Sequence, residues 1–398
     1  MIKLIENKKK VVCKICQKKS EFIFLKKKQP TKIYPSRKLS NLKKRDLNIY
    51  FCKQCSYCFQ HPMPNDKMID KFYKDEDSDI SNYTSLIKNP SIGSLKEKEK
   101  IDFIINSVKK YLKTKKSINI AEVGGFDGYA LYKLSKIFKV KKKLLIEPNK
   151  LGSNIAKSKG ITVNNSYLDE NLVNRYKGNF DLVICKHVIE HVKDYQKFSC
   201  NLTRILSSNG ILIIETPDLN MIFKKGLTRV FILQHLNYFS IISLKKIFEK
   251  LSILKFKTTS QENSIIIAFK NGHNKNQKIN LKIDKNSFKK KLRKDINSLN
   301  KFCKNNKDKK IWIYGASSLI TDIFTLYNVK KECIAGIIDT DKKKTSMRMP
   351  VQNDLPILFY KDKKISKKDA VIITTAAKLE VTKLLNKNSF RGPRFFLQ

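Results

Sequence analysis

Glycines and carboxylates are spaced along residues 118–147 in a way that could hold a nucleoside-like ligand. Glu122 ends an apolar run, and Gly124, Gly125 and Gly128 follow it within six positions. A strand, a glycine-rich turn and the start of a helix let the backbone approach a ligand closely. Glu147 ends the next apolar run, where a carboxylate can accept hydrogen bonds from both hydroxyls of a ribose. The pattern predicts a ligand site built from these residues.

The spacing fits a dinucleotide or S-adenosylmethionine (AdoMet), and the turn itself favours AdoMet. It reads E-x-G-G-x-D-G rather than G-x-G-x-x-G. An acidic side chain suits a cofactor that carries a sulfonium and an ammonium, whereas it would repel a pyrophosphate. Further along, FDLVICKHVIEHV (180–192) adds a strand with Asp181 near its start and a predicted helix that begins around His187. Together these features resemble class I AdoMet-dependent methyltransferases.

Three more residues are expected to border the cofactor. Tyr167 and Leu168 follow the third predicted strand, where an adenine ring is often flanked, and His187 follows the fourth. His187-x-x-Glu190-His191 also matches the H-x-x-E-H pattern of one zinc peptidase class. We favour the cofactor-bordering role for His187 and a packing role for His191, because no obvious third metal ligand follows.

Two C-x-x-C pairs near the N-terminus could bind one metal ion. Each pair can place two thiolates on the ion, and together they close a tetrahedral site, whereas a redox dithiol needs only one pair. Four protein ligands leave no open position, so a zinc ion here would be structural. Cys58 is expected to be a small core residue, and Cys185, Cys200, Cys303 and Cys333 are expected to be buried. The predicted zinc ligands are Cys13, Cys16, Cys52 and Cys55.

Lysine dominates the charge of the chain. The formal net charge is +48, from 83 Lys and Arg against 35 Asp and Glu, and only 9 of these cations are Arg. Proteins that read a nucleic-acid sequence usually use Arg at base edges and aromatic platforms, and neither is concentrated here. We therefore interpret the lysines as solvated and expect no specific nucleic-acid partner. An acidic substrate, such as a nucleotide diphosphate, would still benefit from the positive field.

The elements that must position these residues alternate through the middle of the chain. A helix is expected from Ser94 to Leu112, with Ser94 and Glu97 as a capping box. The strands and helices that follow indicate a mainly parallel sheet with helices on both faces. Ligands lie beyond the carboxyl ends of such strands, so the excursion at 218–240 would pass over the reacting methyl group. The predicted strands are INIAEV, KKLLIE, ITVNN, FDLVICK and GILIIETP.

Three domains are expected along the 398 residues. Residues 1–85 would be a zinc-binding domain that depends on its metal and ends in an acidic stretch at 74–85, read as a linker or an active-site loop. Residues 86–272 would be the AdoMet domain, and residues 273–398 a C-terminal Rossmann-like α/β domain with a strand ending at Asp339. One glycine at its turn is thin support for a second cofactor, so none is predicted there. No apolar run approaches the ~18 residues of a membrane span, and no signal peptide is visible, so a cytoplasmic location is expected.

This order of parts resembles the zinc-containing C-methyltransferases that act on nucleotide-linked keto-deoxysugars. The resemblance runs over nearly the whole chain. It implies AdoMet and structural zinc as cofactors, a small-molecule substrate in surface-polysaccharide or related glycan biosynthesis, and a monomer or homodimer. The matching pieces are the two C-x-x-C pairs, EVGGFDG at 122–128, IEPN from Ile146, IIETP from Ile213, QHLNYFS from Gln234 and YGASS from Tyr314.

The same resemblance places the catalytic base at His235. A histidine can take the proton beside a ketone or weaken a hydroxyl near neutral pH. The chain departs from the family where a tyrosine is replaced by Ile232, an acid by Gln234, and a Gly-Gly-Ser by residues 262–264. We expect Gln234 to leave His235 a weaker base than in relatives. Whether carbon or oxygen is methylated stays open.

Two other functions are compatible with the sequence. A methyltransferase acting on nucleic acid would account for the positive charge and the zinc knuckles, and would bind oligonucleotides with a steep salt dependence. A non-catalytic, zinc-stabilised scaffold with a decayed cofactor pocket would account for the missing tyrosine and glycines.

Overall fold

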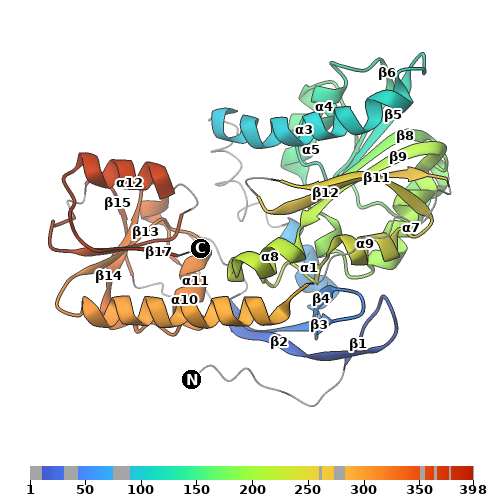
Figure 1. Ribbon diagram of the computed structural model, residues 1–398. Helices are drawn as coiled ribbons and strands as arrows, with labels where there is room; N and C mark the ends of the chain where they lie inside the picture. The colour runs from blue at the N-terminus through green and yellow to red at the C-terminus, as the bar shows by residue number, and fades with distance from the viewer. Residues whose placement is uncertain are drawn as a thin grey trace.

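Three β-sheets organise the described part of the protein, whose computed structural model is shown in Figure 1. None of the helices in the described part of the chain has the length and apolar character needed to span a bilayer. The predicted linker at 74–85, apart from its first residue, and the connection at 273–282 lie outside the described residues. The structure describes residues 11–30, 44–74, 90–259, 262–272, 283–349, 355–362, 365–375 and 378–397.

The N-terminal sheet is an antiparallel meander completed by a strand from far along the chain. The order is β1-β2-β3-β4-β10, and β10 pairs antiparallel with β4, Asn237 opposite Phe59 and Tyr238 opposite Cys58. The excursion at 218–240 therefore forms the edge of this sheet, a contact that the sequence did not indicate. The elements are β1 (Val11–Val12), β2 (Lys19–Pro30), β3 (Lys44–Cys52), β4 (Tyr57–Gln60), β10 (Asn237–Tyr238) and the following helix α1 (Asp66–Lys74).

The central sheet has seven strands in the order β11-β12-β9-β8-β5-β6-β7. Strands β5 to β9 are parallel, and β12 and β11 add an antiparallel hairpin at one edge. The chain adds β6 and β7 on one side of β5 and then returns to place β8 and β9 on the other side. The order of the strands therefore reverses between β5 and β8. All five predicted strands are confirmed: β5 (Ile118–Val123), β6 (Val140–Ile146), β7 (Thr162–Asn164), β8 (Phe180–Lys186) and β9 (Leu206–Pro217), with the hairpin β11 (Leu251–Thr258) and β12 (Ser264–Asn271).

Apolar side chains on both faces of this sheet explain why helices cover both. Successive residues of a strand point to opposite faces. Leu182 accordingly packs in one core cluster with α3 and α4, while the next residue, Val183, packs in another with α7 and α9. Helix α3 begins at Pro90, so Ser94 lies inside it and the predicted capping box is wrong. The helices are α3 (Pro90–Leu112), α4 (Tyr129–Leu134), α5 (Lys150–Ser158), α6 (Glu170–Arg175), α7 (Tyr195–Ile205), α8 (Leu219–Lys225) and α9 (Ile241–Ile247).

The C-terminal sheet is entirely parallel, in the order β15-β14-β13-β16-β17. It shares a core cluster with α8, α10 and the N-terminal sheet, so the three units pack together (Figure 1). Within this contact Lys27 of β2 pairs with Asp322 of α11 at 2.6 Å, both side chains 1% exposed. The elements are α10 (Lys285–Asn305), β13 (Ile311–Tyr314), α11 (Leu319–Thr325), β14 (Ile334–Asp339), β15 (Ile357–Phe359), β16 (Ala370–Ile373), α12 (Lys378–Lys387) and β17 (Arg394–Phe396).

Candidate functional site

The glycine-rich turn leaves β5 where the central sheet reverses, which is where ligands bind in open α/β sheets. Gly124 has φ 70° and Gly128 has φ 65°, in the left-handed region that favours glycine. A Cβ on Gly124 would lie 2.3 Å from Cγ2 of Val188, in the segment after β8. The turn therefore passes so close to the end of β8 that a side chain at Gly124 has no room.

Glu147 lies at this turn, as predicted. Its Oε2 accepts a hydrogen bond from Phe126 N at 2.8 Å, and its Oε1 accepts one from Asn149 N at 2.8 Å. Burial raises the pKa of this carboxyl group, and the two backbone donors oppose that rise. The structure thus brings the glycine turn and the acid after β6 into direct contact.

Glu122 lies beneath the turn. Its Oε2 accepts a hydrogen bond from Leu131 N at 3.1 Å, and a Cβ on Gly125 would lie 2.4 Å from its Cδ. Burial raises the pKa of Glu122 to about 7, against the opposing effect of Lys186. The carboxyl group therefore joins the turn to the first turn of α4.

Tyr167 and Leu168 have different surroundings. The Tyr167 hydroxyl donates to Asp70 Oδ1 of α1 at 3.4 Å, and its side chain is well exposed. Burial of the hydroxyl and the nearby Asp70 raise the pKa of Tyr167 to about 12. Leu168 packs in the core on one face of the sheet. Of the two, Tyr167 offers an accessible ring.

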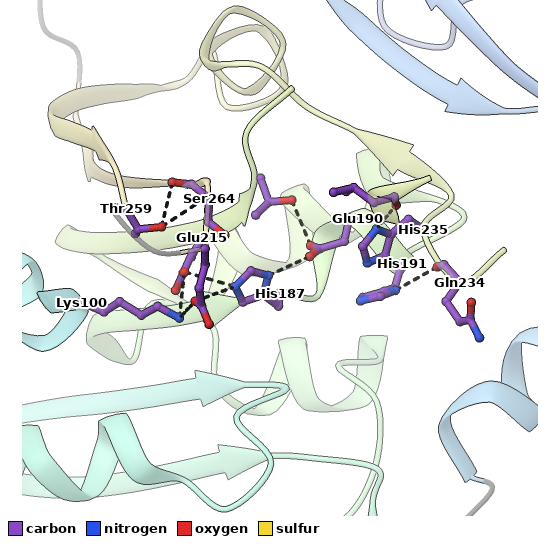
Figure 2. Close-up of polar contacts among 12 residues, drawn as sticks. Lys100, His187, Glu190, His191, Glu215, Gln234, His235, Thr259 and Ser264 are labelled. Atoms are coloured by element: carbon purple, nitrogen blue, oxygen red, sulfur yellow. Dashed lines mark hydrogen bonds and ion pairs between the residues drawn. The ribbon is translucent and has the colours of Figure 1, made fainter. Parts of the chain in front are cut away.

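His187 connects the ends of β8 and β9. Its Nδ1 donates to Glu190 Oε1 at 3.1 Å and its Nε2 to Glu215 Oε1 at 3.2 Å (Figure 2). Burial lowers the pKa of His187, but Glu215 and Glu190 outweigh it and raise the pKa to about 10, so the ring is an imidazolium at neutral pH. The predicted helix start is wrong, because His187 has φ 53° and α7 begins only at Tyr195. His187 and His191 do not form an i, i+4 pair on one α-helix.

A charged cluster surrounds His187. Lys100 Nζ of α3 lies 3.0 Å from Glu215 and 2.5 Å from Glu262, and Lys186 Nζ lies 2.8 Å from Glu97. Sequence reasoning missed Lys100, Lys186 and Glu215. Lys186 and Glu215 were within reach of that reasoning, since each sits at the carboxyl end of a predicted parallel strand.

The β11–β12 hairpin carries Glu262 to this cluster. Thr259 N donates to Ser264 O at 2.7 Å, and Ser264 N donates to Thr259 Oγ1 at 3.2 Å (Figure 2). These bonds close the hairpin beside β9, where Ser264 pairs with Pro217. The segment that replaces the family's Gly-Gly-Ser therefore supplies a carboxylate instead.

His235, the predicted base, lies in the excursion and faces His191. Its Nδ1 donates to Val230 O at 2.9 Å, and the two imidazole centroids are 4.8 Å apart. Burial, and then His191, lower the pKa of His235 to about 3, so the ring is neutral and weakly basic. The Gln234 side chain extends away from the His235 ring (Figure 2).

The four predicted zinc ligands come together. Their sulfur atoms all lie within 4.8 Å of one another, and those of Cys16 and Cys52 are 3.6 Å apart. Four thiolates around zinc at about 2.3 Å would be about 3.8 Å apart, so this group fits the ion. The hydrogen bond from Cys13 lowers the pKa of Cys52 to about 5, whereas burial raises that of Cys55 to about 12. Lys246 Nζ of α9 lies 3.6 Å from the sulfur of Cys55.

The other cysteines differ in exposure. Cys58, Cys185 and Cys303 are buried as predicted. Cys200 and Cys333 are exposed, so the prediction is wrong for these two. Cys200 lies on the amphipathic helix α7 and Cys333 in a short 3₁₀ helix before β14, where apolar sequence neighbours do not imply burial.

Comparison with known proteins agrees with this geometry. Residues 96–251 match the family model described as a methyltransferase domain. A ubiquinone biosynthesis O-methyltransferase of Rickettsia canadensis is 43% identical over 63 residues, which are 15% of this chain and 25% of that protein. The chain thus spans about a quarter of the length of that curated relative.

The solved structures that are similar to this chain include two methyltransferases. One, from Thermotoga maritima, is described as a possible histamine N-methyltransferase; it is 17% identical, with TM-score 0.36, covering 51% of this chain and 98% of that one. The other is the 1,6-didemethyltoxoflavin-N1-methyltransferase of Burkholderia thailandensis, 7% identical, with TM-score 0.40, covering 57% and 96%. The family match, with the strand order and the glycine turn, leads to one conclusion: the central part of this chain is an AdoMet-dependent methyltransferase domain with a class I Rossmann-like fold.

Proposed function

We propose that this protein transfers the methyl group of AdoMet to a nucleotide-linked sugar. The observation that carries the AdoMet part is the contact between Glu147 and the glycine turn. Each carboxylate oxygen has two lone pairs, so both oxygens of Glu147 can accept ribose hydroxyls while they hold Phe126 N and Asn149 N. Tyr167 would lie beside the adenine, and Gly124 lets the backbone reach the methionine portion.

AdoMet brings its own leaving group, so the chain must align the acceptor and remove a proton. The acceptor side would be the charged cluster around His187, where Lys100 and Lys186 are paired with glutamates. Attraction of a negatively charged substrate would come from the overall positive charge of the chain. His235 remains the candidate for the proton acceptor, and burial and His191, not Gln234, lower its pKa. Support for the sugar comes from the resemblance in motif order.

A hydroxyl acceptor is the second candidate for the same site. The stretch of 63 residues similar to the ubiquinone biosynthesis O-methyltransferase favours it. Both candidates use the same cofactor contacts and differ only in the atom that receives the methyl group.

We also propose that Cys13, Cys16, Cys52 and Cys55 hold a structural zinc ion. Four sulfur ligands leave no position for a substrate. Metal analysis of the purified protein should find one zinc per chain, and Cys52→Ala should lose it and lower the melting temperature. Retention of zinc by that variant would contradict the assignment.

The function is tested with AdoMet labelled in its methyl group with carbon-13. Calorimetry should first show AdoMet binding, with S-adenosylhomocysteine competing. Incubation with nucleotide-linked keto sugars and with phenolic acceptors should then yield one labelled product, and NMR would place the label on carbon or oxygen. Absence of AdoMet binding by folded, zinc-loaded protein would overturn the proposal, and labelling of phenols alone would replace the sugar with the second candidate.

A further inference from the structure

A second group of potential metal ligands lies apart from the cysteines. Glu190, His191 and His235 each place one ligand atom within 4.8 Å of the others. An ion bound at about 2.1 Å requires donors about 3–4 Å apart, so small side-chain rotations would bring the three together. Two imidazoles and one carboxylate are a donor set that suits divalent transition metals.

Hydrogen bonds fix both imidazoles in the form that binds metal. His191 Nδ1 lies 2.9 Å from Gln234 O, and His235 Nδ1 lies 2.9 Å from Val230 O. A carbonyl oxygen can only accept, so each Nδ1 carries the hydrogen and each Nε2 carries the lone pair. Metal-binding histidines typically donate their other N–H in this way. Figure 2 shows the two rings on the same side of Glu190.

The carboxylate is held just as firmly. Glu190 is buried, its Oε1 accepts from His187, and its Oε2 accepts from Thr216 Oγ1 at 3.1 Å. The second nitrogen of His187 donates to Glu215, so the charge of that ring is already balanced. All three ligands therefore have an outer partner that orients them, as in established metal sites.

The neighbouring group of His187, Glu215 and Glu262 makes a useful contrast. Its ligand atoms also lie within 4.8 Å of one another. However, Lys100 Nζ already lies 3.0 Å from Glu215 and 2.5 Å from Glu262, so an ammonium fills the place that an ion would take. The carboxylate of Glu190 also has a cationic neighbour, His187, but its ligand atom lies within 4.8 Å of those of His191 and His235.

The backbone around the three ligands is firmly positioned. Leu236 N donates to Glu190 O at 2.8 Å, which joins the excursion to the 3₁₀ turn at Ile189–His191. Asn237 Nδ2 donates to Val192 O at 2.7 Å. The two imidazoles are only partly buried, so an ion held by three protein ligands would keep positions open to the solvent side.

We propose that Glu190, His191 and His235 bind a divalent transition-metal ion through one carboxylate oxygen and two Nε2 atoms. That such an ion would act on the methyl acceptor rests on the proposed function. With open positions it could take an acceptor oxygen and ease the loss of its proton to solvent. His235, with Nδ1 bonded to Val230 O and Nε2 on the ion, would then hold the metal instead of acting as the base. The binding itself stands without that function.

Manganese is the probe, because it prefers oxygen and nitrogen donors and leaves the cysteines to zinc. Zinc-loaded protein is titrated with Mn²⁺, and the free ion is followed by electron paramagnetic resonance. We expect one Mn²⁺ per chain. His191→Gln and His235→Gln should each weaken binding about tenfold or more, and Thr216→Val, which removes an outer partner, about tenfold. His61→Gln, at the residue that follows β4, is the matched control and should bind as the parent does.

Pulsed resonance on the parent protein gives a second measurement that needs no variant. It should detect imidazole nitrogens coupled to the bound Mn²⁺. Three results would each overturn the site. The parent could fail to bind Mn²⁺ at millimolar concentration, or His191→Gln and His235→Gln could bind Mn²⁺ as tightly as the parent does. The third result is bound Mn²⁺ without nitrogen coupling. AdoMet calorimetry on the same samples separates the two proposals: Mn²⁺ binding without AdoMet binding removes the function and leaves the site.

Discussion

The central and C-terminal α/β units build the same turn and surround it with different side chains. Gly124 N donates to Ile146 O at 2.9 Å, and Gly315 N donates to Ile338 O at 2.7 Å. Both glycines have positive φ, 70° and 99°. In each unit the turn lies next to a carboxylate at the end of the neighbouring strand, Glu147 in one and Asp339 in the other.

The carboxylates themselves repeat the arrangement. Ala316 N donates to Asp339 Oδ2 at 2.8 Å and Asp341 N to Asp339 Oδ1 at 2.9 Å, as Phe126 and Asn149 do for Glu147 in the central unit. A shared backbone pattern therefore does not distinguish a cofactor site from a structural turn.

The side chains around the turns make the difference. Lys344 Nζ lies 3.0 Å from Asp339, which neutralises the carboxylate. Thr374 Oγ1 donates to Gly315 O at 2.5 Å and so ties the turn to the end of β16. Two residues before its glycine the C-terminal unit has Ile313, where the central unit has Glu122. We therefore propose that charge, rather than backbone geometry, makes the central turn the cofactor site.

Substitution of the two glycines should give the largest contrast. Gly124→Arg should abolish detectable AdoMet binding, because a side chain there meets Val188 and φ is positive. Gly315→Ala also places a side chain at a positive φ, at a cost of about 1–2 kcal/mol, but should leave AdoMet affinity unchanged. Calorimetry on both folded variants checks this, and equal loss of binding would show that the central turn is not the site.

The next largest effect concerns Glu122 and pH. Its raised pKa, about 7, means that its protonated form is favoured in the folded state. The preference of the folded state for protonated Glu122 stabilises the protein fully below about pH 4.5, the pKa of Glu in the unfolded chain. This stabilisation is lost as pH rises through about 7. Glu122→Gln should therefore stabilise the protein above pH 7 by up to about 3 kcal/mol and flatten the dependence, while AdoMet binds more weakly.

Thermal melts between pH 5 and pH 9 measure this change. Glu332→Gln is the control, since Glu332 lies in an exposed 3₁₀ helix of the C-terminal unit. An unchanged pH profile in Glu122→Gln would mean that Glu122 is not the titrating group.

Exchange of the two carboxylates for amides should sharpen the comparison further. Glu147→Gln should weaken AdoMet binding about 10- to 100-fold, because a hydrogen bond to a charged group contributes about 1.5–3 kcal/mol. Asp339→Asn should leave that affinity alone and lower only the melting temperature. If Asp339→Asn weakens AdoMet binding as much, the two turns are not distinct in function.

Removal of the Lys344 side chain should have the smallest effect. The Lys344–Asp339 pair is partly exposed, so Lys344→Ala should change the free energy of unfolding by less than about 1 kcal/mol. Denaturant unfolding measures it. A gain of AdoMet or nucleotide binding by this variant would show that the lysine alone closes the C-terminal turn.

Much of the architecture could be predicted because the strands are short apolar runs bounded by polar residues. The turn at Gly124, the acid at Glu147 and the two cysteine pairs follow from local spacing. The helix expected at His187 failed because His187 has a positive φ and its ring bonds Glu215, which is 28 residues away in the sequence. Local patterns carry no information on such pairings.

The charged cluster and the edge strand β10 escaped prediction for the same reason. Lys100 meets Glu215 only after α3 packs on the sheet, and β10 has only two residues. His235 was found through resemblance. Its partner His191 could not be, since no spacing in the sequence links the two.

The pairing of β10 with β4 joins the N-terminal sheet, which carries the four clustered cysteines, to the methyltransferase domain. Gln60 N donates to Leu236 O at 2.9 Å, next to His235. A shortened chain that starts at residue 86 would remove this backing, expose an unpaired strand edge and loosen the wall that carries His235. The central unit alone, fused to another protein, would keep the glycine turn. It would lack the N-terminal sheet that supports the segment with His235.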